Sequence, residues 1–132
     1  MSCHLARGVA VAVAVAAAAG CASAPKYIEA DCPVYEGLGE VRVNPAGAPQ
    51  RYLRFGAAFQ VCPPDEGVTE IQRKRIELKH NMLSLLSSQT EQQLNDPLRA
   101  EKLREQLLFM VNEKVLKKGR AIDVYITAME LE

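Results

Sequence analysis

The chain has 132 residues, with 16 Lys plus Arg against 16 Asp plus Glu, two His, four Cys and no Trp. This charge balance argues against a nucleic-acid-binding protein, because such a protein needs a surplus of basic side chains to meet phosphates. A chain of this length buries one hydrophobic core and not two. We therefore expect no cofactor and favour a binding or assembly module over an enzyme.

Residues 1–20 are typical of a secretory signal peptide. Arg7 precedes an uncharged run of Val and Ala, and this run is shorter than the ~20 residues that a membrane-spanning helix usually needs. Removing residues 1–20 leaves 112 residues with 15 basic and 16 acidic side chains. The mature chain is therefore close to neutral.

The apolar run ends at Ala18-Ala19-Gly20-Cys21, and small residues directly before a cysteine resemble the bacterial lipobox. We expect lipid attachment at Cys21, although the lipobox usually carries Leu where this chain has Ala18. Cleavage after Ala24 and an uncleaved membrane anchor are the alternatives. All three place the rest of the chain on the periplasmic side of a bacterial membrane. Ala22 favours the outer membrane, but the sequence leaves the choice between inner and outer membrane open.

Cys32 and Cys62 remain after Cys21. In an oxidising compartment two such thiols usually form a disulfide. Neither belongs to a C-x-x-C pair. His80, the single histidine of the mature chain, adds too few ligands to complete a zinc site with them. A Cys32–Cys62 disulfide therefore depends on whether the fold brings the two Cα atoms close enough, which the sequence leaves open.

Residues 21–39 contain small residues, two prolines and charges without periodicity, and we expect a lipid-anchored flexible tether there. The folded domain is expected over residues 40–132. Its first strand contains Val41 and Val43 and ends at a turn with two prolines and a glycine. From Tyr52 to Val61 every second residue is apolar, which predicts a strand with one face in the core.

The next segment predicts a long helix. Thr69 with Gln72 fits a capping box, in which the Thr oxygen accepts a free backbone N–H and the Gln side chain reaches back to the cap. The apolar spacing that follows predicts a helix from about Glu70 to Ser87. The residues expected to face the core are Ile71, Leu78, Met82, Leu85 and Leu86.

Two further helical segments follow. Thr90 with Gln93 predicts a single turn ending near Leu94. Asp96-Pro97 predicts the start of a second main helix, because Pro at the first helical position loses no hydrogen bond. Lys117-Lys118-Gly119 predicts its end, with Gly119 in the left-handed conformation. The residues expected to point inward are Leu103, Leu107, Met110 or Val111, and Val115.

The chain ends in a predicted strand. Ile122, Val124, Ile126 and Ala128 alternate with residues that we expect on the opposite face. The order strand, strand, helix, helix, strand predicts an α+β fold. We expect a small antiparallel or mixed sheet with two main helices packed on one face.

Candidate catalytic residues are few. His80 lies in the middle of a predicted helix with no carboxylate at a fixed spacing to orient it, and Ser84, Ser87 and Ser88 have no G-x-S-x-G turn around them. The sequence contains no Gly-rich phosphate loop and no metal-ligand spacing. We therefore predict no catalytic, metal-binding or cofactor-binding residues. A deep pocket that joined His80 to the serines would indicate an enzyme or a small-ligand carrier instead.

Four motifs follow one another along the folded part. They are Arg51–Phe55 preceded by Val43-Asn44, Leu83–Thr90, Leu103–Leu107 followed by Asn112, and Ile122–Met129. In this order they resemble the flagellar basal-body-associated FliL family, with its "R-Y-L-R" opening, "L-L-S-S-x-T" helix end, "L-R-x-x-L" helix and closing "D-V-Y-x-T" strand. The resemblance covers about Val41 to Glu132.

The resemblance implies a stomatin-like (SPFH-like) fold that assembles side by side into a ring or arc. It also implies a non-enzymatic role in motility and chemotaxis, through periplasmic contact with flagellar stator and basal-body proteins. Family members usually keep an uncleaved inner-membrane helix, whereas this chain is expected to carry a lipid at Cys21. This difference leaves a second hypothesis open, a self-assembling envelope lipoprotein with the same fold and a scaffold role unrelated to motility.

Overall fold

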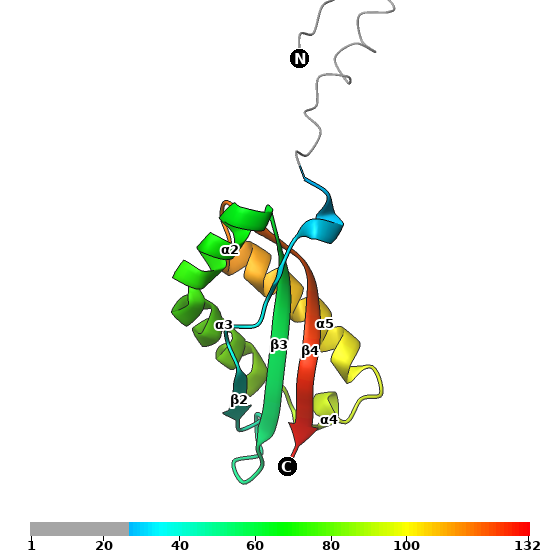
Figure 1. Cartoon of the computed structure of the whole chain (residues 1–132). Coiled ribbons are helices and arrows are strands. Elements are labelled where there is room, and N and C mark those ends of the chain that lie inside the picture. Colours follow the sequence, from blue (N-terminus) through cyan, green and yellow to red (C-terminus); the bar gives the residue numbers. More distant parts are fainter. Residues whose placement is uncertain (1–26) are drawn as a thin grey trace, which may run out of the picture.

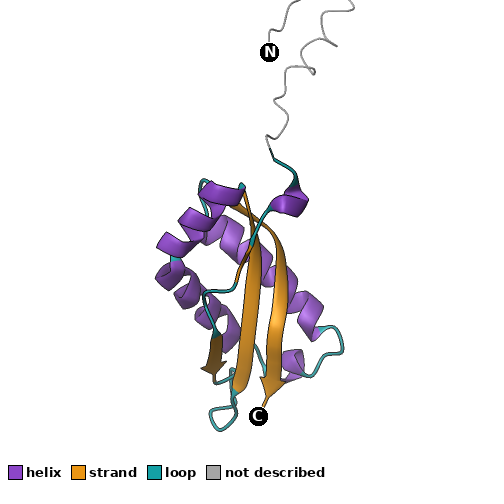
Figure 2. Cartoon of the chain, viewed as in Figure 1, coloured by secondary structure: helices purple, strands orange, loops and turns teal. Residues whose placement is uncertain are grey.

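The computed structural model describes residues 27–132. The expected signal peptide, residues 1–20, and the expected lipidation site, Cys21, lie outside the described residues. Helices and strands carry the labels of Figure 1. The described part is an α+β domain in which helices cover one face of a small antiparallel sheet (Figures 1 and 2). The predicted fold class is confirmed to this extent.

Strand β3 (Leu53–Cys62) is the centre of the sheet. On one side it pairs along its whole length with β4 (Arg120–Leu131). On the other side it pairs with β2 (Glu40–Val43) near its start and with β1 (Val34–Tyr35) near its end. All of these pairs are antiparallel. The predicted alternation of β3 is confirmed, and its buried core residues are Leu53, Phe55, Ala57, Phe59 and Val61.

Four helices and a π-helical turn form the second layer. They are α2 (Pro64–Arg73), α3 (Arg75–Ser87), the single turn α4 (Glu91–Leu94), α5 (Arg99–Met110) and the π-helical turn η3 (Val111–Val115). Their apolar faces pack on the sheet, so most of the predicted inward residues are confirmed, and only Leu85 is half-buried. The fully buried helical side chains are Ile71, Leu78, Met82, Leu86, Leu103, Leu107, Val111 and Val115.

The predicted capping box at Thr69 and the single helix over residues 70–87 are wrong. Helix α2 already begins at Pro64, with Pro63 as its N-cap, and the backbone N–H of Gly67 donates to the Pro63 carbonyl at 2.8 Å. A proline at the first helical position has a suitable φ and loses no hydrogen bond there. The helical path is then interrupted at Lys74, whose ψ is 21°.

The predicted single helical turn that ends near Leu94 is confirmed. Thr90 and Gln93 form the predicted reciprocal capping box at α4. Helix α5 begins at Arg99 with Leu98 as its N-cap, so the prediction of Pro97 as its first helical residue is wrong. The Asp96 carboxylate instead accepts the Leu98 N–H at 2.7 Å in the turn before the helix. Gly119 does not adopt the predicted left-handed conformation. Among residues 27–132, the glycines with positive φ are Gly39 and Gly47.

Two bulges change the inward residues of β4. The ladder skips Thr127 between the pairs Gly56–Ala128 and Ala57–Ile126, and it skips a second residue, Ile122, nearer the start of β4. Each extra residue reverses the alternation of side chains between the two faces. Val124 and Ile126 face the core as predicted, but Ile122 and Ala128 do not. The additional residues on the core side are Ala121, Met129 and Leu131.

The end of the predicted tether belongs to the folded part. A 3-10 turn, η2 (Glu29–Asp31), precedes β1, and the backbone N–H of Val61 donates to the Pro33 carbonyl at 3.0 Å. Cys32, Tyr35 and Leu38 are buried. Periodicity did not reveal this segment because β1 has only two residues.

Gly67 lies where α2 crosses the end of β3. A Cβ atom at this position would lie 2.8 Å from the Cys62 carbonyl oxygen and 2.9 Å from its carbonyl carbon. Alanine normally stabilises a helix relative to glycine by about 1 kcal/mol. We expect the opposite here: Gly67→Ala should lower the free energy of unfolding by about 1–3 kcal/mol, because the backbone must shift.

Urea denaturation of the purified domain checks this expectation. The matched control is Thr69→Ala, at an exposed position of the same helix, which should change the stability little. A Gly67→Ala variant as stable as the parent would show that α2 can move away from Cys62 at no cost.

Candidate interaction surface

The residues considered for catalysis do not form a site. His80 is exposed on α3. The hydroxyls of Ser87 and Ser88 donate to the carbonyls of Ser84 and Leu85, at 3.1 and 2.6 Å, and so close the end of α3. Within residues 27–132 no group of three or more His, Cys, Asp or Glu side chains is placed to hold a metal ion. The described part of the chain also has no helix both long and apolar enough to cross a membrane.

A groove of about 660 Å³ runs between α3 and α5 on the outer side of the helical layer. Its lining is more apolar than polar and includes Phe109, which is 67% exposed. Ser84 and Ser88 line the groove but His80 does not. The groove therefore does not join His80 to the serines. Its principal lining residues are Ser84, Leu85, Ser88, Gln106, Phe109 and Lys114.

Polar side chains form hydrogen bonds at one end of this groove, between the end of α3 and the start of α4. Gln89 is only 6% exposed, and its amide donates to the Gln106 side-chain oxygen at 3.2 Å and to the Leu85 carbonyl at 3.3 Å. The Lys102 ammonium lies 2.7 Å from the Asp96 carboxylate. The Lys102 hydrogen bond lowers the pKa of Asp96. Gln89 thus links the end of α3 to α5, whereas the Lys102–Asp96 pair joins α5 to the turn that precedes it.

The most strongly constrained polar group of the domain is the Glu70 carboxylate, at the end of the molecule where α2 meets β4. Glu70 is 3% exposed. Its oxygens accept the backbone N–H groups of Lys117, Lys118 and Gly119 at 2.7–3.2 Å. The Lys74 ammonium lies 3.1 Å from the same carboxylate and also donates to the Val115 carbonyl at 2.9 Å. Glu70 thus fastens α2 to the loop that leads into β4.

This geometry sets the protonation of Glu70. Burial by itself would raise the pKa of the carboxyl group. The backbone N–H groups of Gly119, Lys117 and Lys118 and the Lys74 ammonium outweigh burial and lower the pKa to about 2. Glu70 is therefore a charged, fully hydrogen-bonded structural group at neutral pH. No local motif marks it, because three of its partners are 47 to 49 residues away in the sequence.

A defined acid sensitivity follows from this pKa. The pKa of Glu70 in the folded state, about 2, lies below the usual 4.5. Its stabilising contribution is therefore complete above pH 4.5 and is lost as the pH falls from 4.5 towards 2. We expect the stability difference between the wild type and Glu70→Gln to shrink over this range, as measured by urea denaturation at several pH values. A difference independent of pH would contradict this account of the carboxylate.

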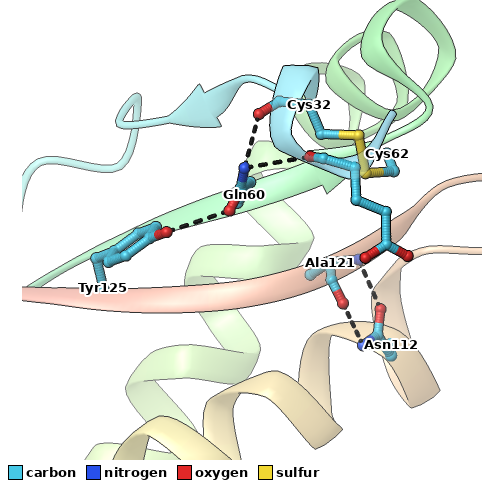
Figure 3. The surroundings of a disulfide bond; sticks show 7 residues. Cys32, Gln60, Cys62, Asn112, Ala121 and Tyr125 are labelled. Atoms are coloured by element: carbon cyan, nitrogen blue, oxygen red, sulfur yellow. Dashed lines mark hydrogen bonds between the residues drawn. A yellow bond between two sulfur atoms is a disulfide. The ribbon is translucent and has the colours of Figure 1, made fainter. Parts of the chain in front are cut away.

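The segment that enters the domain is held at the end of β3. Cys32 and Cys62 form a disulfide, with Cα atoms 5.2 Å apart (Figure 3). The Gln60 side-chain amide donates to the Cys32 carbonyl at 3.0 Å, and the Tyr125 hydroxyl donates to the Gln60 side-chain oxygen at 3.2 Å. Strands β3 and β4 thus both hold this segment in place.

The outer face of the sheet carries an ion-pair network. The Arg54 guanidinium lies 2.6 Å from Glu130 and 3.0 Å from Glu40, and these hydrogen bonds raise its pKa. Glu132 lies 3.7 Å from Arg54 and 3.8 Å from Arg42. The network joins β2, β3 and β4 at their exposed end.

The four motifs quoted above lie close together in the fold. They occupy β3, the α3–α4 junction, α5 with η3, and β4. The Asn112 side chain joins the third motif to the residue directly before the fourth, since its amide donates to the Ala121 carbonyl at 2.9 Å and its oxygen accepts the Ala121 N–H at 2.8 Å (Figure 3). Each motif therefore supplies part of one packed unit.

Comparison with known families gives one match. Residues 35–130 match the model of the family described as flagellar basal body-associated protein FliL. The matched region begins in β1, ends in β4 and covers more than half of the chain. A search of curated proteins finds no match to the chain.

Proposed function

The chain belongs to the FliL family, and we propose that it is a non-enzymatic accessory protein of the flagellar motor that associates with stator units in the periplasm and supports motility. Family membership implies a role at the flagellar basal body and a membrane-associated location. The match over residues 35–130, almost the whole folded domain, is the observation that carries the proposal. We further propose that the fold is stomatin-like and that the domain assembles side by side into a ring or arc.

The surface features support contact with proteins rather than catalysis. The α3–α5 groove is broad, partly apolar and lined in part by exposed Phe109, and aromatic residues are enriched at the centres of protein interfaces. The Cys32–Cys62 disulfide agrees with an oxidising compartment outside the cytoplasm. We propose that the helical face is the stator-facing surface.

The anchor limits which partners the domain can reach. We propose that residues 1–20 are a signal peptide and that Cys21 carries the lipid. Because the folded part begins near Glu29, the residues from Cys21 to Ile28 span at most about 28 Å when extended. The domain therefore works beside the membrane that holds its anchor. An anchor in the inner membrane allows stator contact, whereas one in the outer membrane allows contact only with components there.

A deletion of the chromosomal copy tests the motor role. We expect altered swimming or swarming with an unchanged number of flagella, restored by the wild-type chain. Crosslinking in intact cells, followed by mass spectrometry of a tagged copy, should recover stator or basal-body peptides. Phe109→Ser is the interface variant and His80→Ser, exposed on α3, is its control. We expect the first to lose the crosslinks and the second to keep them.

The proposed lipid anchor supports a second candidate function. In this alternative the chain is a self-assembling envelope lipoprotein with a scaffold role unrelated to motility. The motif at Cys21, which differs from the inner-membrane helix usual for the family, favours it. Normal motility of the deletion strain, with only self-crosslinks of the tagged chain, would establish this second function and overturn the first.

A further inference from the structure

Strand β4 lies at an edge of the sheet. Within residues 27–132 it pairs with β3 alone, and its outer side is visible in Figure 1 as the border of the sheet. An edge strand presents backbone N–H and C=O groups that can pair with another extended chain. The two halves of this edge are not equivalent.

The direction of the backbone groups follows from the ladder. Tyr52 and Glu132 exchange both backbone hydrogen bonds, at 3.1 and 2.8 Å. Because bonded and non-bonded pairs alternate along an antiparallel ladder, Leu131 and Met129 belong to non-bonded pairs with β3. Their N–H and C=O groups therefore point away from β3, towards the free side.

Side chains cap the half of the edge nearest the start of β4. Asn112 takes the place of a neighbouring strand by bonding both the N–H and the C=O of Ala121. Asp123 accepts the Val124 N–H at 2.8 Å and is held by Arg104 at 2.9 Å. Among the hydrogen bonds formed within residues 27–132, none does the same for the second half of the edge.

A second groove, of about 300 Å³, lies beside this uncapped half. Its exposed lining is mostly polar and includes Asn95, Arg99 and Glu130, and its smaller apolar part comes from Leu53, Leu94, Met129 and Leu131. Side chains of an added strand alternate between the two faces of a sheet. Every second side chain of a peptide paired with β4 would therefore lie over this groove, as in other cases of strand addition beside a helix.

The charge on the opposite face favours a basic partner. The network there contains three carboxylates, Glu40, Glu130 and Glu132, but only two guanidinium groups, Arg42 and Arg54. Glu130 is on β4 itself and its side chain is 58% exposed. A lysine or arginine opposite Glu130 would neutralise the excess.

We propose that residues 126–131 of β4 bind an extended peptide segment of a partner protein by strand addition, with alternate side chains over the groove and a basic side chain beside Glu130. Capping by Asn112 and Asp123 confines the added strand to this half. The proposal goes beyond the motor role and does not depend on it.

Nuclear magnetic resonance of the ¹⁵N-labelled full chain tests the proposal, with the blocked peptide acetyl-Val-Lys-Val-Lys-Val-amide at millimolar concentration as the probe. We expect shifted resonances and slower hydrogen exchange for the amides of Met129 and Leu131. The amides of Ala121 and Val124 are already bonded and should change little. Changes that leave out Met129 and Leu131, or that centre on the α3–α5 groove, would overturn the proposal.

Matched variants distinguish the contribution of the Leu131 backbone N–H to peptide binding from that of the Leu131 side chain. Leu131→Pro removes the outward donor at the end of an edge strand, where proline is tolerated, and should abolish peptide binding. Leu131→Ala keeps the donor and should retain binding. Equal loss in both variants would show that the side chain, not strand addition, holds the peptide.

A charge test uses the same probe. Glu130→Gln should weaken binding of the lysine peptide about two- to fivefold, the effect of one opposite-charge cross-strand pair. Glu113→Gln, at an exposed position of η3, is the control and should have no effect. Equal binding of a peptide with glutamate in place of lysine would refute the basic partner. Resonances that shift with protein concentration alone would instead identify a second copy of the chain as the occupant.

Discussion

Replacing Glu70 by glutamine is expected to lower the free energy of unfolding by about 3 kcal/mol at neutral pH. The wild-type carboxylate accepts backbone N–H groups from three consecutive residues, Lys117 to Gly119, and pairs with Lys74. Glutamine keeps a single acceptor oxygen and points an N–H₂ group at backbone donors, so buried groups lose their partners. The size agrees with a pKa lowered from 4.5 to about 2, since one pKa unit corresponds to about 1.4 kcal/mol.

Urea denaturation at pH 7 measures this effect, with hydrogen exchange to locate it. Asp65→Asn removes an exposed carboxylate from the first turn of the same helix and should cost less than about 1 kcal/mol. In Glu70→Gln we expect faster exchange of the amides of Lys117 and Gly119. Stability and exchange equal to those of the wild type would show that water replaces the carboxylate without loss.

Removing the Cys32–Cys62 disulfide is the second large effect, expected to lower the free energy of unfolding by about 2–5 kcal/mol. The bond closes a segment with a sequence separation of 30, and in the chain-entropy account such a closure restricts the unfolded state. In the folded state two-residue β1, a few hydrogen bonds and the buried side chains of Tyr35 and Leu38 would still hold the entering segment.

Thermal denaturation of the double variant Cys32→Ala/Cys62→Ala is the measurement, and a double variant is used because it leaves no unpaired thiol. The oxidised wild type is the reference, and the reduced wild type should resemble the variant. Proteolysis should then cleave first between residues 29 and 38. An unchanged melting temperature would contradict the prediction and show that β1 and Gln60 hold this segment unaided.

Neighbouring residues determined much of the secondary structure. The alternation of β3 predicts its buried face, and the capping box of Thr90 and Gln93 predicts α4. These patterns succeed because a strand face or a helix cap depends on residues within a few positions of one another. The start of α2 was missed because two signals competed, and proline at the first helical position prevailed over the capping pattern at Thr69.

The candidate contact surfaces were predicted only in outline. The resemblance implied contacts between neighbouring subunits and with stator proteins, but the sequence did not indicate the groove between α3 and α5. It also did not indicate that Asn112 and Asp123 cap half of β4. Asn112 appeared only as the residue that follows a helix motif. Its effect depends on the π-helical turn η3, which brings it beside Ala121.

The sequence by itself determined the α+β class, the order of the main elements and the family. The tertiary structure decided the role of Glu70, the disulfide, the folding of residues 29–38 against β3 and the inward face of β4. The physical reason is distance along the chain. Backbone propensity and side-chain periodicity are local, whereas the backbone partners of Glu70 and the disulfide partner of Cys32 are 30 or more residues away. Only the packed core brings them into contact.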